Sequence, residues 1–195
     1  MTLDKLVVNS QTFTYDNVDA LPEYVKSNVN SPVCMKQSDD VTIFFTARNP
    51  LSNFHECSFT VGDHRYVCVE QYMSQQKAIL FGTPVIANQI MNMTDPKLMK
   101  QTVRRLKGYD DTVWESNAAD FLQTALKAKF CQNDKLREAL LATNDTTIGE
   151  ASSSDLLFGI GMSLTNKHSM DKTKWCGANL HGVSLMAVRD AIKNN

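Results

Sequence analysis

The sequence has no apolar run that approaches the roughly 18 residues of a membrane-spanning helix. Its first residues, MTLDKLVVNSQTFTY, lack the basic start and long apolar segment of a secretory signal. The five cysteines form no C-x-x-C pair, and their number is odd. We therefore expect reduced thiols rather than disulfides. Together these absences predict a cytoplasmic or nuclear protein that is not secreted and does not enter a membrane.

Motifs for metals and nucleotide cofactors are also missing. The four histidines, at positions 55, 64, 168 and 181, show no H-E-x-x-H or other ligand spacing. There is no G-x-x-x-x-G-K-[ST] and no strand-linked G-x-G-x-x-G, and FGIG at 158–161 is too short to replace either motif. We therefore predict no metal site and no cofactor.

An excess of positive charge is lacking as well. The formal net charge is −1, from 20 basic and 21 acidic residues. A protein that coats nucleic acid is usually basic, so any contact with DNA must come from a local basic patch. The 195 residues, 43% of them hydrophobic, suit one domain with a core of ordinary size, with or without an appendage.

The residues that are present predict an α+β protein, a mainly helical single domain with a small hairpin or sheet. Residues 1–40, with short apolar patches between polar residues, are predicted to be an accessory segment that forms a hairpin or a helix. VTIFF at 41–45 predicts a strand, and 57–69 predicts a hairpin around Gly62-Asp63. Helices are predicted from Glu70 onward, and residues 144–178 are predicted to be a long loop.

The stretch VEQYMSQQKA, residues 69–78, begins the first of these helices with an acid. Glu70, Ser74 and Lys77 fall within about 60° of one another on a helix, and no clean polar face remains. The helix is therefore expected to be buried on most sides. A buried carboxylate must be paired or have a raised pKa, because an isolated buried charge is costly. A structural ion pair or a partly exposed helix end is the alternative to a catalytic role.

Three other positions have both a structural and a functional interpretation. Trp114 is either a core residue or a plate on which a flat ligand stacks. Arg104, beside Arg105 in VRRLK, is either solvated surface or a phosphate clamp. Asp155 is either a turn residue or the second carboxylate that glycosidic chemistry often needs.

Taken together, several blocks resemble the NADAR or YbiA-like family in order and spacing, from about residue 41 to 192. They are NPLSNF, VEQYMSQQKA, DP…VRR…VWES, LKAKFCQNDKLREALLAT, GEASSSDLLFGIG and GANLHGVSLMAVRDAI. The resemblance makes residues 41–195 a NADAR-like catalytic domain. It implies an N-glycosidase, which hydrolyses the bond between ribose C1 and a nitrogen. One branch of the family acts on early riboflavin intermediates, and another removes ADP-ribose from guanine in DNA.

The resemblance also implies roles for residues. Glu70 and Asp155 are the expected catalytic carboxylates. The expected substrate-binding residues are Asn53, Lys77, Arg104, Trp114, Phe158, Gly159 and Asn179, and Arg189 is a further match. Where many members have Trp-Gly, this chain has Phe158-Gly159; Phe158 keeps stacking but loses the indole N–H donor. Asp155, Lys77 or water remain alternatives for the group that protonates the leaving base.

Four functions compete on this basis. The first is removal of ADP-ribose from guanine in DNA, with ADP-ribose or an ADP-ribosylated guanine nucleotide as ligand. It is favoured by the loop at 152–178, which carries Lys167, His168, Lys172 and Lys174 and suits a large anionic substrate. The second is hydrolysis of a ribosylaminopyrimidine phosphate in riboflavin synthesis. The third is a non-catalytic ADP-ribose-binding module, against which Glu70 argues. The fourth is a structural helical domain.

Overall fold

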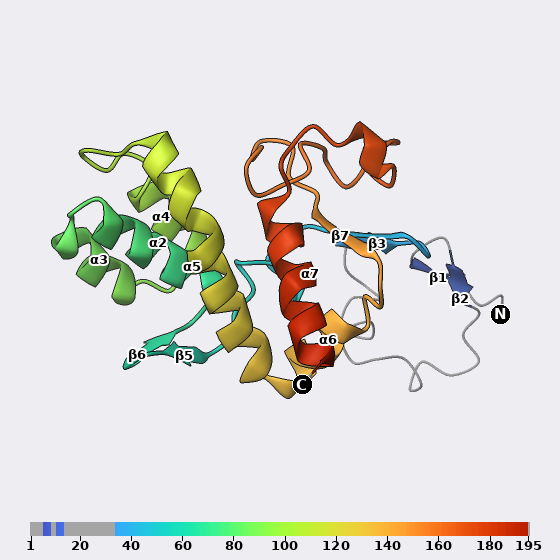
Figure 1. Ribbon diagram of the computed structural model, residues 1–195, viewed down its shortest axis with the longest axis horizontal. Coiled ribbons are helices and arrows are strands. Elements are labelled where there is room, and N and C mark those ends of the chain that lie inside the picture. The colour runs from blue at the N-terminus through green and yellow to red at the C-terminus, as the bar shows by residue number, and fades with distance from the viewer. Residues whose placement is uncertain (1–5, 9–10, 14–33, 195) are drawn as a thin grey trace.

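The computed structural model describes residues 6–8, 11–13 and 34–194, and it has the predicted α+β fold with mostly helices (Figure 1). Most of the predicted accessory segment, residues 1–40, lies outside the described residues. No helix in the described part of the chain is long and apolar enough to cross a membrane. The helices are α2 (Val69–Leu80), α3 (Pro84–Met91), α4 (Pro96–Thr102), α5 (Asp111–Cys131), α6 (Asp134–Leu141), the short 3₁₀ helix η2 (Lys172–Lys174) and α7 (Leu180–Lys193).

The strands form three small sheets. They are β1 (Leu6–Val8) with β2 (Gln11–Phe13); β3 (Met35–Gln37), β4 (Val41–Phe44) and β7 (Thr147–Glu150); and β5 (Phe59–Val61) with β6 (His64–Tyr66). The predicted strand at 41–45 and hairpin at 57–69 are thus present in shorter form. Gly62 turns the hairpin with a φ of 57°, a left-handed conformation that glycine adopts without strain.

The prediction of a continuous loop over 144–178 is wrong, because this segment contains β7 and η2. The four residues of β7 are too few to show a periodic pattern. The strand is defined by its partner, β4, which lies more than 100 residues earlier and runs parallel, with Val41 opposite Thr147 and Phe44 opposite Glu150.

This parallel pair determines where the neighbouring loops lie. The carboxyl ends of parallel strands meet at one edge of a sheet, and ligands of α/β proteins bind at such edges. The segment after Phe44 and the segment after Glu150 therefore leave the sheet on the same side. The first leads to Asn53, and the second leads to Asp155 and Phe158.

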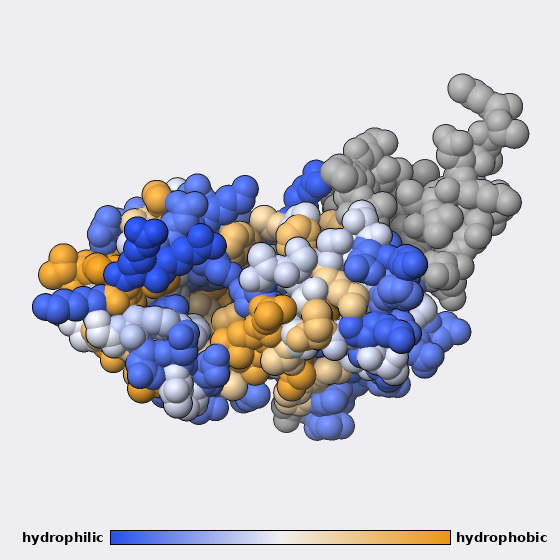
Figure 2. Space-filling model, turned by 90° about the horizontal axis from the view of Figure 1, so that it is seen from above, coloured by the Kyte–Doolittle hydropathy of each residue, from blue (hydrophilic) through white to orange (hydrophobic). Residues whose placement is uncertain are grey.

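The core surrounds α5, which lies between α2 to α4 on one side and α7 with the three-stranded sheet on the other (Figure 1). The apolar positions of α5 recur at spacings of three and four, and Leu122, Leu126 and Phe130 are fully buried. Asp110 caps the helix by accepting a hydrogen bond from Val113 N at 2.9 Å. Seen from above, hydrophilic side chains cover much of the surface, and apolar ones gather near the middle of this face and at its left edge (Figure 2).

Candidate active site

Glu70 lies at the start of α2, where only 8% of it is exposed. Its backbone N–H donates to Asn53 O at 3.0 Å, and its Oε1 accepts from Ser74 Oγ at 3.0 Å. Burial raises the pKa of Glu70 from its usual 4.5 to about 7, although the charge of Lys100 and the Ser74 hydroxyl lower it. Glu70 therefore exchanges its proton near neutral pH, which suits a group that takes part in acid–base or electrostatic catalysis.

Glu70 faces a cavity of about 100 Å³ that contains most of the predicted site residues. Pockets that enclose a whole drug-sized ligand are several times larger, roughly 300–1,000 Å³, so this cavity holds only part of a nucleotide. The residues that line it are Asn53, Glu70, Met73, Ser74, Lys77, Lys100, Val103, Arg104, Trp114 and Phe158. The structure thus brings together residues from five separate stretches of the chain.

Trp114 belongs both to the core and to the cavity wall. Only 6% of it is exposed, and it packs within the core cluster around α5 while lining the cavity. Lys77 Nζ lies 4.8 Å from the ring of Trp114 and 4.2 Å from that of Tyr109. Burial lowers the pKa of Lys77, and the aromatic faces attract its charged form. The two interpretations of Trp114 are therefore compatible.

Asp155 is fixed by an ion pair with Lys100. Lys100 Nζ donates to Asp155 Oδ2 at 2.8 Å, and Asp155 Oδ1 accepts from Phe158 N at 3.0 Å. Burial alone would raise the pKa of Asp155, but the charge and hydrogen bond of Lys100 outweigh it and the pKa is lowered. Of the two residues, Lys100 lines the cavity and Asp155 does not. Asp155 therefore remains ionised at neutral pH.

Arg104 and Arg105 follow α4 in a turn, and both are exposed. Arg104 lines the cavity and Arg105 does not. This difference is expected, because the side chains of adjacent residues point in different directions. Arg104 lies at the mouth of the cavity, where a guanidinium can bind a phosphate group.

Asn179 and Gly159 lie in the framework of the loop rather than in the cavity lining. Asn179 accepts from Glu150 N at 3.2 Å and donates to Ile148 O at 2.8 Å, so its amide holds β7. A side chain at Gly159 would come within 2.7 Å of Ser152 Cβ. These contacts position the loop that carries Phe158, and direct substrate contact by Asn179 or Gly159 stays a prediction.

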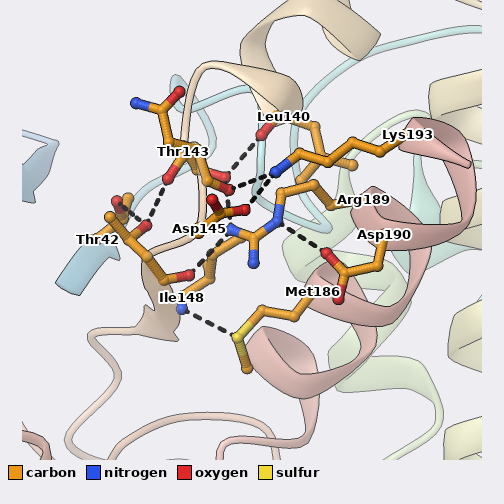
Figure 3. A network of polar contacts seen from close by, with 11 residues as sticks. Thr42, Leu140, Thr143, Asp145, Ile148, Met186, Arg189, Asp190 and Lys193 are labelled. Carbon is orange, nitrogen blue, oxygen red and sulfur yellow. Dashed lines mark hydrogen bonds and ion pairs between the residues drawn. The ribbon is translucent and has the colours of Figure 1, made fainter. Parts of the chain in front are cut away.

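Arg189 is structural in this arrangement (Figure 3). Only 4% of it is exposed, and its Nη1 donates to Thr143 Oγ1 at 3.0 Å and to Thr146 O at 2.9 Å. It therefore ties α7 to the turn that precedes β7, on which the site depends.

Lys100 and the pair formed by Glu150 and His181 are titratable residues near the site that the sequence did not reveal. Lys100 precedes Arg104 by four residues, the spacing at which helical residues share a face, and this was the available signal. His181 is fully buried, and its Nδ1 lies 3.2 Å from Glu150 Oε2. The charge of Glu150 raises the pKa values of both Glu70 and Lys100.

In the described part of the chain, no three His, Cys, Asp or Glu side chains gather in a group that could hold a metal.

A desolvated glutamate, an ionised aspartate paired with lysine and an aromatic wall define a site suited to positively charged transition states. Comparison with known proteins identifies the class. The NADAR domain matches residues 43–193. The chain belongs to the NADAR family.

Named relatives and a solved structure agree with this assignment. The chain is 37% identical over 125 residues to N-glycosidase R617 of Acanthamoeba polyphaga mimivirus, covering 64% of this chain and 74% of that protein. It is 27% identical over 138 residues to Riboflavin biosynthesis protein VVA0006 of Vibrio vulnificus, covering 70% of this chain and 35% of that protein. The NMR structure of the E. coli protein YbiA matches with a TM-score of 0.66 at 25% identity, over 80% of this chain and 86% of that one. By homology, the chain is an N-glycosidase.

Proposed function

We propose that this protein removes ADP-ribose from guanine bases in DNA by hydrolysing the bond between ribose C1 and the guanine nitrogen. The observation that carries the proposal is the position of Glu70, a buried carboxylate at the wall of a small cavity whose other walls are aromatic and cationic. Breaking an N-glycosidic bond develops positive charge on the sugar ring. A carboxylate already in place stabilises that charge without reorganisation.

In the reaction, the C1–N bond breaks and its electron pair goes to the base. Water adds its hydroxyl to C1, and a proton is transferred to the departing nitrogen. Glu70 faces the sugar because it lies on the cavity wall, and its pKa of about 7 leaves it partly ionised at neutral pH and able to orient water. Asp155 holds Lys100 and remains negative, so it acts by charge rather than as the proton donor.

The small size of the cavity supports a substrate that extends beyond it. The sugar occupies the cavity, and the phosphates lie at its mouth beside Arg104. The loop that carries Phe158 also carries exposed lysines at positions 167, 172 and 174, which suit the rest of an ADP-ribose or a nucleic-acid strand.

The second candidate is hydrolysis of a ribosylaminopyrimidine phosphate, which the name of the Vibrio relative favours. That substrate carries a single phosphate group and needs the same carboxylate at C1. The two candidates therefore share Glu70 and differ in what lies outside the cavity.

The test offers both substrates to the purified protein. An ADP-ribosylated oligonucleotide and the ribosylaminopyrimidine phosphate are incubated separately, and released base and sugar are followed by mass spectrometry. We expect free ADP-ribose and restored guanine from the oligonucleotide, and far slower release from the pyrimidine compound. The reverse order would support the second candidate. Glu70→Gln serves as the matched control for background hydrolysis.

A further inference from the structure

Asn53 has a buried acceptor that the protein itself does not use. Only 9% of Asn53 is exposed, it lines the cavity, and its Oδ1 has no hydrogen-bond partner among the described residues. Buried polar atoms are nearly always hydrogen-bonded, because leaving one unpaired is costly. An unpaired acceptor on the wall of a cavity is therefore available to a hydrogen-bond donor that enters the cavity.

The position of Asn53 is fixed from both sides. The preceding carbonyl, Ser52 O, accepts from Lys129 Nζ at 2.9 Å, and Lys129 is completely buried. The carbonyl of Asn53 itself accepts from Glu70 N at 3.0 Å. The backbone of Asn53 is therefore fixed before any ligand binds, and with it the point from which its side chain reaches the cavity wall.

The same backbone bond makes Asn53 and Glu70 neighbours on one wall. If Glu70 faces C1 of a ribose, the side chain beside it faces a group next to C1. The ring neighbours of C1 are the ring oxygen, which can only accept a hydrogen bond, and C2, whose 2′-hydroxyl can donate one, so the 2′-hydroxyl is the sugar group that suits an open acceptor. Hydrogen bonds to this hydroxyl strengthen in the transition state of glycoside hydrolysis.

We infer that Asn53 accepts a hydrogen bond from the ribose 2′-hydroxyl and makes the enzyme selective for ribosides over 2′-deoxyribosides. The inference rests on the proposed function and gives it a chemical logic. Guanine ADP-ribosylated in DNA carries two N-glycosidic bonds, one to the ribose of ADP-ribose and one to the deoxyribose of the strand. An enzyme that repairs the base must break the first and spare the second, and the 2′-hydroxyl distinguishes them.

The test pairs two substrates with variants of Asn53. The substrates are guanine-containing oligonucleotides modified with ADP-ribose or with its analogue that lacks the hydroxyl next to C1. The wild-type protein should favour the hydroxylated substrate in kcat/KM by about 10²-fold or more, since sites built to bond a hydroxyl reject analogues without it by up to about 10⁵-fold. Asn53→Leu should lose most of this preference by slowing the hydroxylated substrate alone. Asn53→Asp keeps an acceptor oxygen and should retain a preference.

The outcomes distinguish failure of this inference from failure of the proposed function. Equal losses on both substrates in Asn53→Leu would overturn the inference, because they would show that Asn53 acts without reading the hydroxyl. A loss of kcat/KM in Asn53→Leu that depends on the leaving base and not on the sugar would also overturn the inference, because Asn53 would then bind the base. The ratio of the wild-type kcat/KM values on the two substrates is measured without any variant. A ratio near one would therefore overturn the inference even if Asn53→Leu failed to fold. Failure of the wild type to cleave either substrate would overturn the proposed function itself.

Discussion

Lys100 and Asp155, 55 residues apart in the chain, form an ion pair with 2.8 Å between Nζ and Oδ2. The pair joins the end of α4 to the loop after β7 and holds a positive charge beside Glu70. Asp155 is kept ionised, and Glu70 is left as the carboxyl group that titrates near neutral pH. The two carboxyl groups therefore differ in their protonation near neutral pH, because their environments differ.

Glu70→Gln should reduce kcat by about 10²-fold or more, the usual effect of removing one preorganised electrostatic partner. The amide preserves size and can still bond Ser74, so the fold should remain. The measurement is release of base and sugar under saturating substrate, with circular dichroism as the check on folding. A variant with near wild-type kcat would remove Glu70 from the mechanism.

The same substitution should stabilise the protein at high pH. The folded-state pKa of Glu70 is raised from 4.5 to about 7, so its favourable contribution is complete below pH 4.5 and is lost as the pH rises through 7. The corresponding penalty is about 3 kcal/mol. Urea unfolding should therefore show Glu70→Gln to be more stable than wild type at pH 8, with the difference shrinking toward pH 5. A difference independent of pH would contradict the raised pKa.

Two neighbouring charges should shift the pH profile in opposite directions. The positive charge of Lys100 lowers the pKa of Glu70, and the negative charge of Glu150 raises it, as does that of Asp155. The acidic limb of kcat/KM, which reports ionisation of Glu70, should move to higher pH in Lys100→Met and to lower pH in Glu150→Gln. Shifts in the same direction would show that another group controls this limb.

Arg104→Ala should weaken ADP-ribose binding by about 1.5 kcal/mol, the lower end of the range for hydrogen bonds to charged groups, because the side chain is exposed. Arg105→Ala is the matched control and should change little, since Arg105 does not line the cavity. Calorimetry at two salt concentrations measures the ADP-ribose affinity of both variants and of the wild type. Salt should weaken wild-type binding more than binding to the Arg104 variant. Equal losses in the two variants would indicate a diffuse basic surface.

Trp114→Ala should affect stability and binding together. Truncating this buried side chain leaves a core cavity, with an expected loss of about 3–5 kcal/mol in the free energy of unfolding. Loss of the aromatic side chain from the cavity wall should also weaken ligand binding, by about 1–3 kcal/mol if a ring of the ligand stacks on it. Urea unfolding and calorimetry separate the two effects, and Trp114→Phe should restore much of both. Normal binding by folded Trp114→Ala would leave only the core role.

The sequence by itself determined the helices and the main catalytic candidate. Helix starts depend on residues within one turn, such as Asp95 before Pro96, whose side chain accepts from Lys97 N. The lack of a polar face predicted that α2 is buried. A buried Glu70 must be paired or have a raised pKa, which made it a candidate catalytic residue. The family blocks then supplied Trp114 and Arg104, which the structure places on the same cavity as Glu70.

Only the tertiary structure decided what depends on distant partners. Strand β7 exists because Val41–Phe44 pairs with it across more than 100 residues, and its sequence of four residues carries no pattern of its own. The pairing of Lys100 with Asp155 and the open acceptor of Asn53 likewise depend on groups that are remote in the chain. Periodicity and capping are local and can be read from neighbours, whereas a pKa, an ion pair and an unpaired buried atom are set by which surfaces meet when the chain folds.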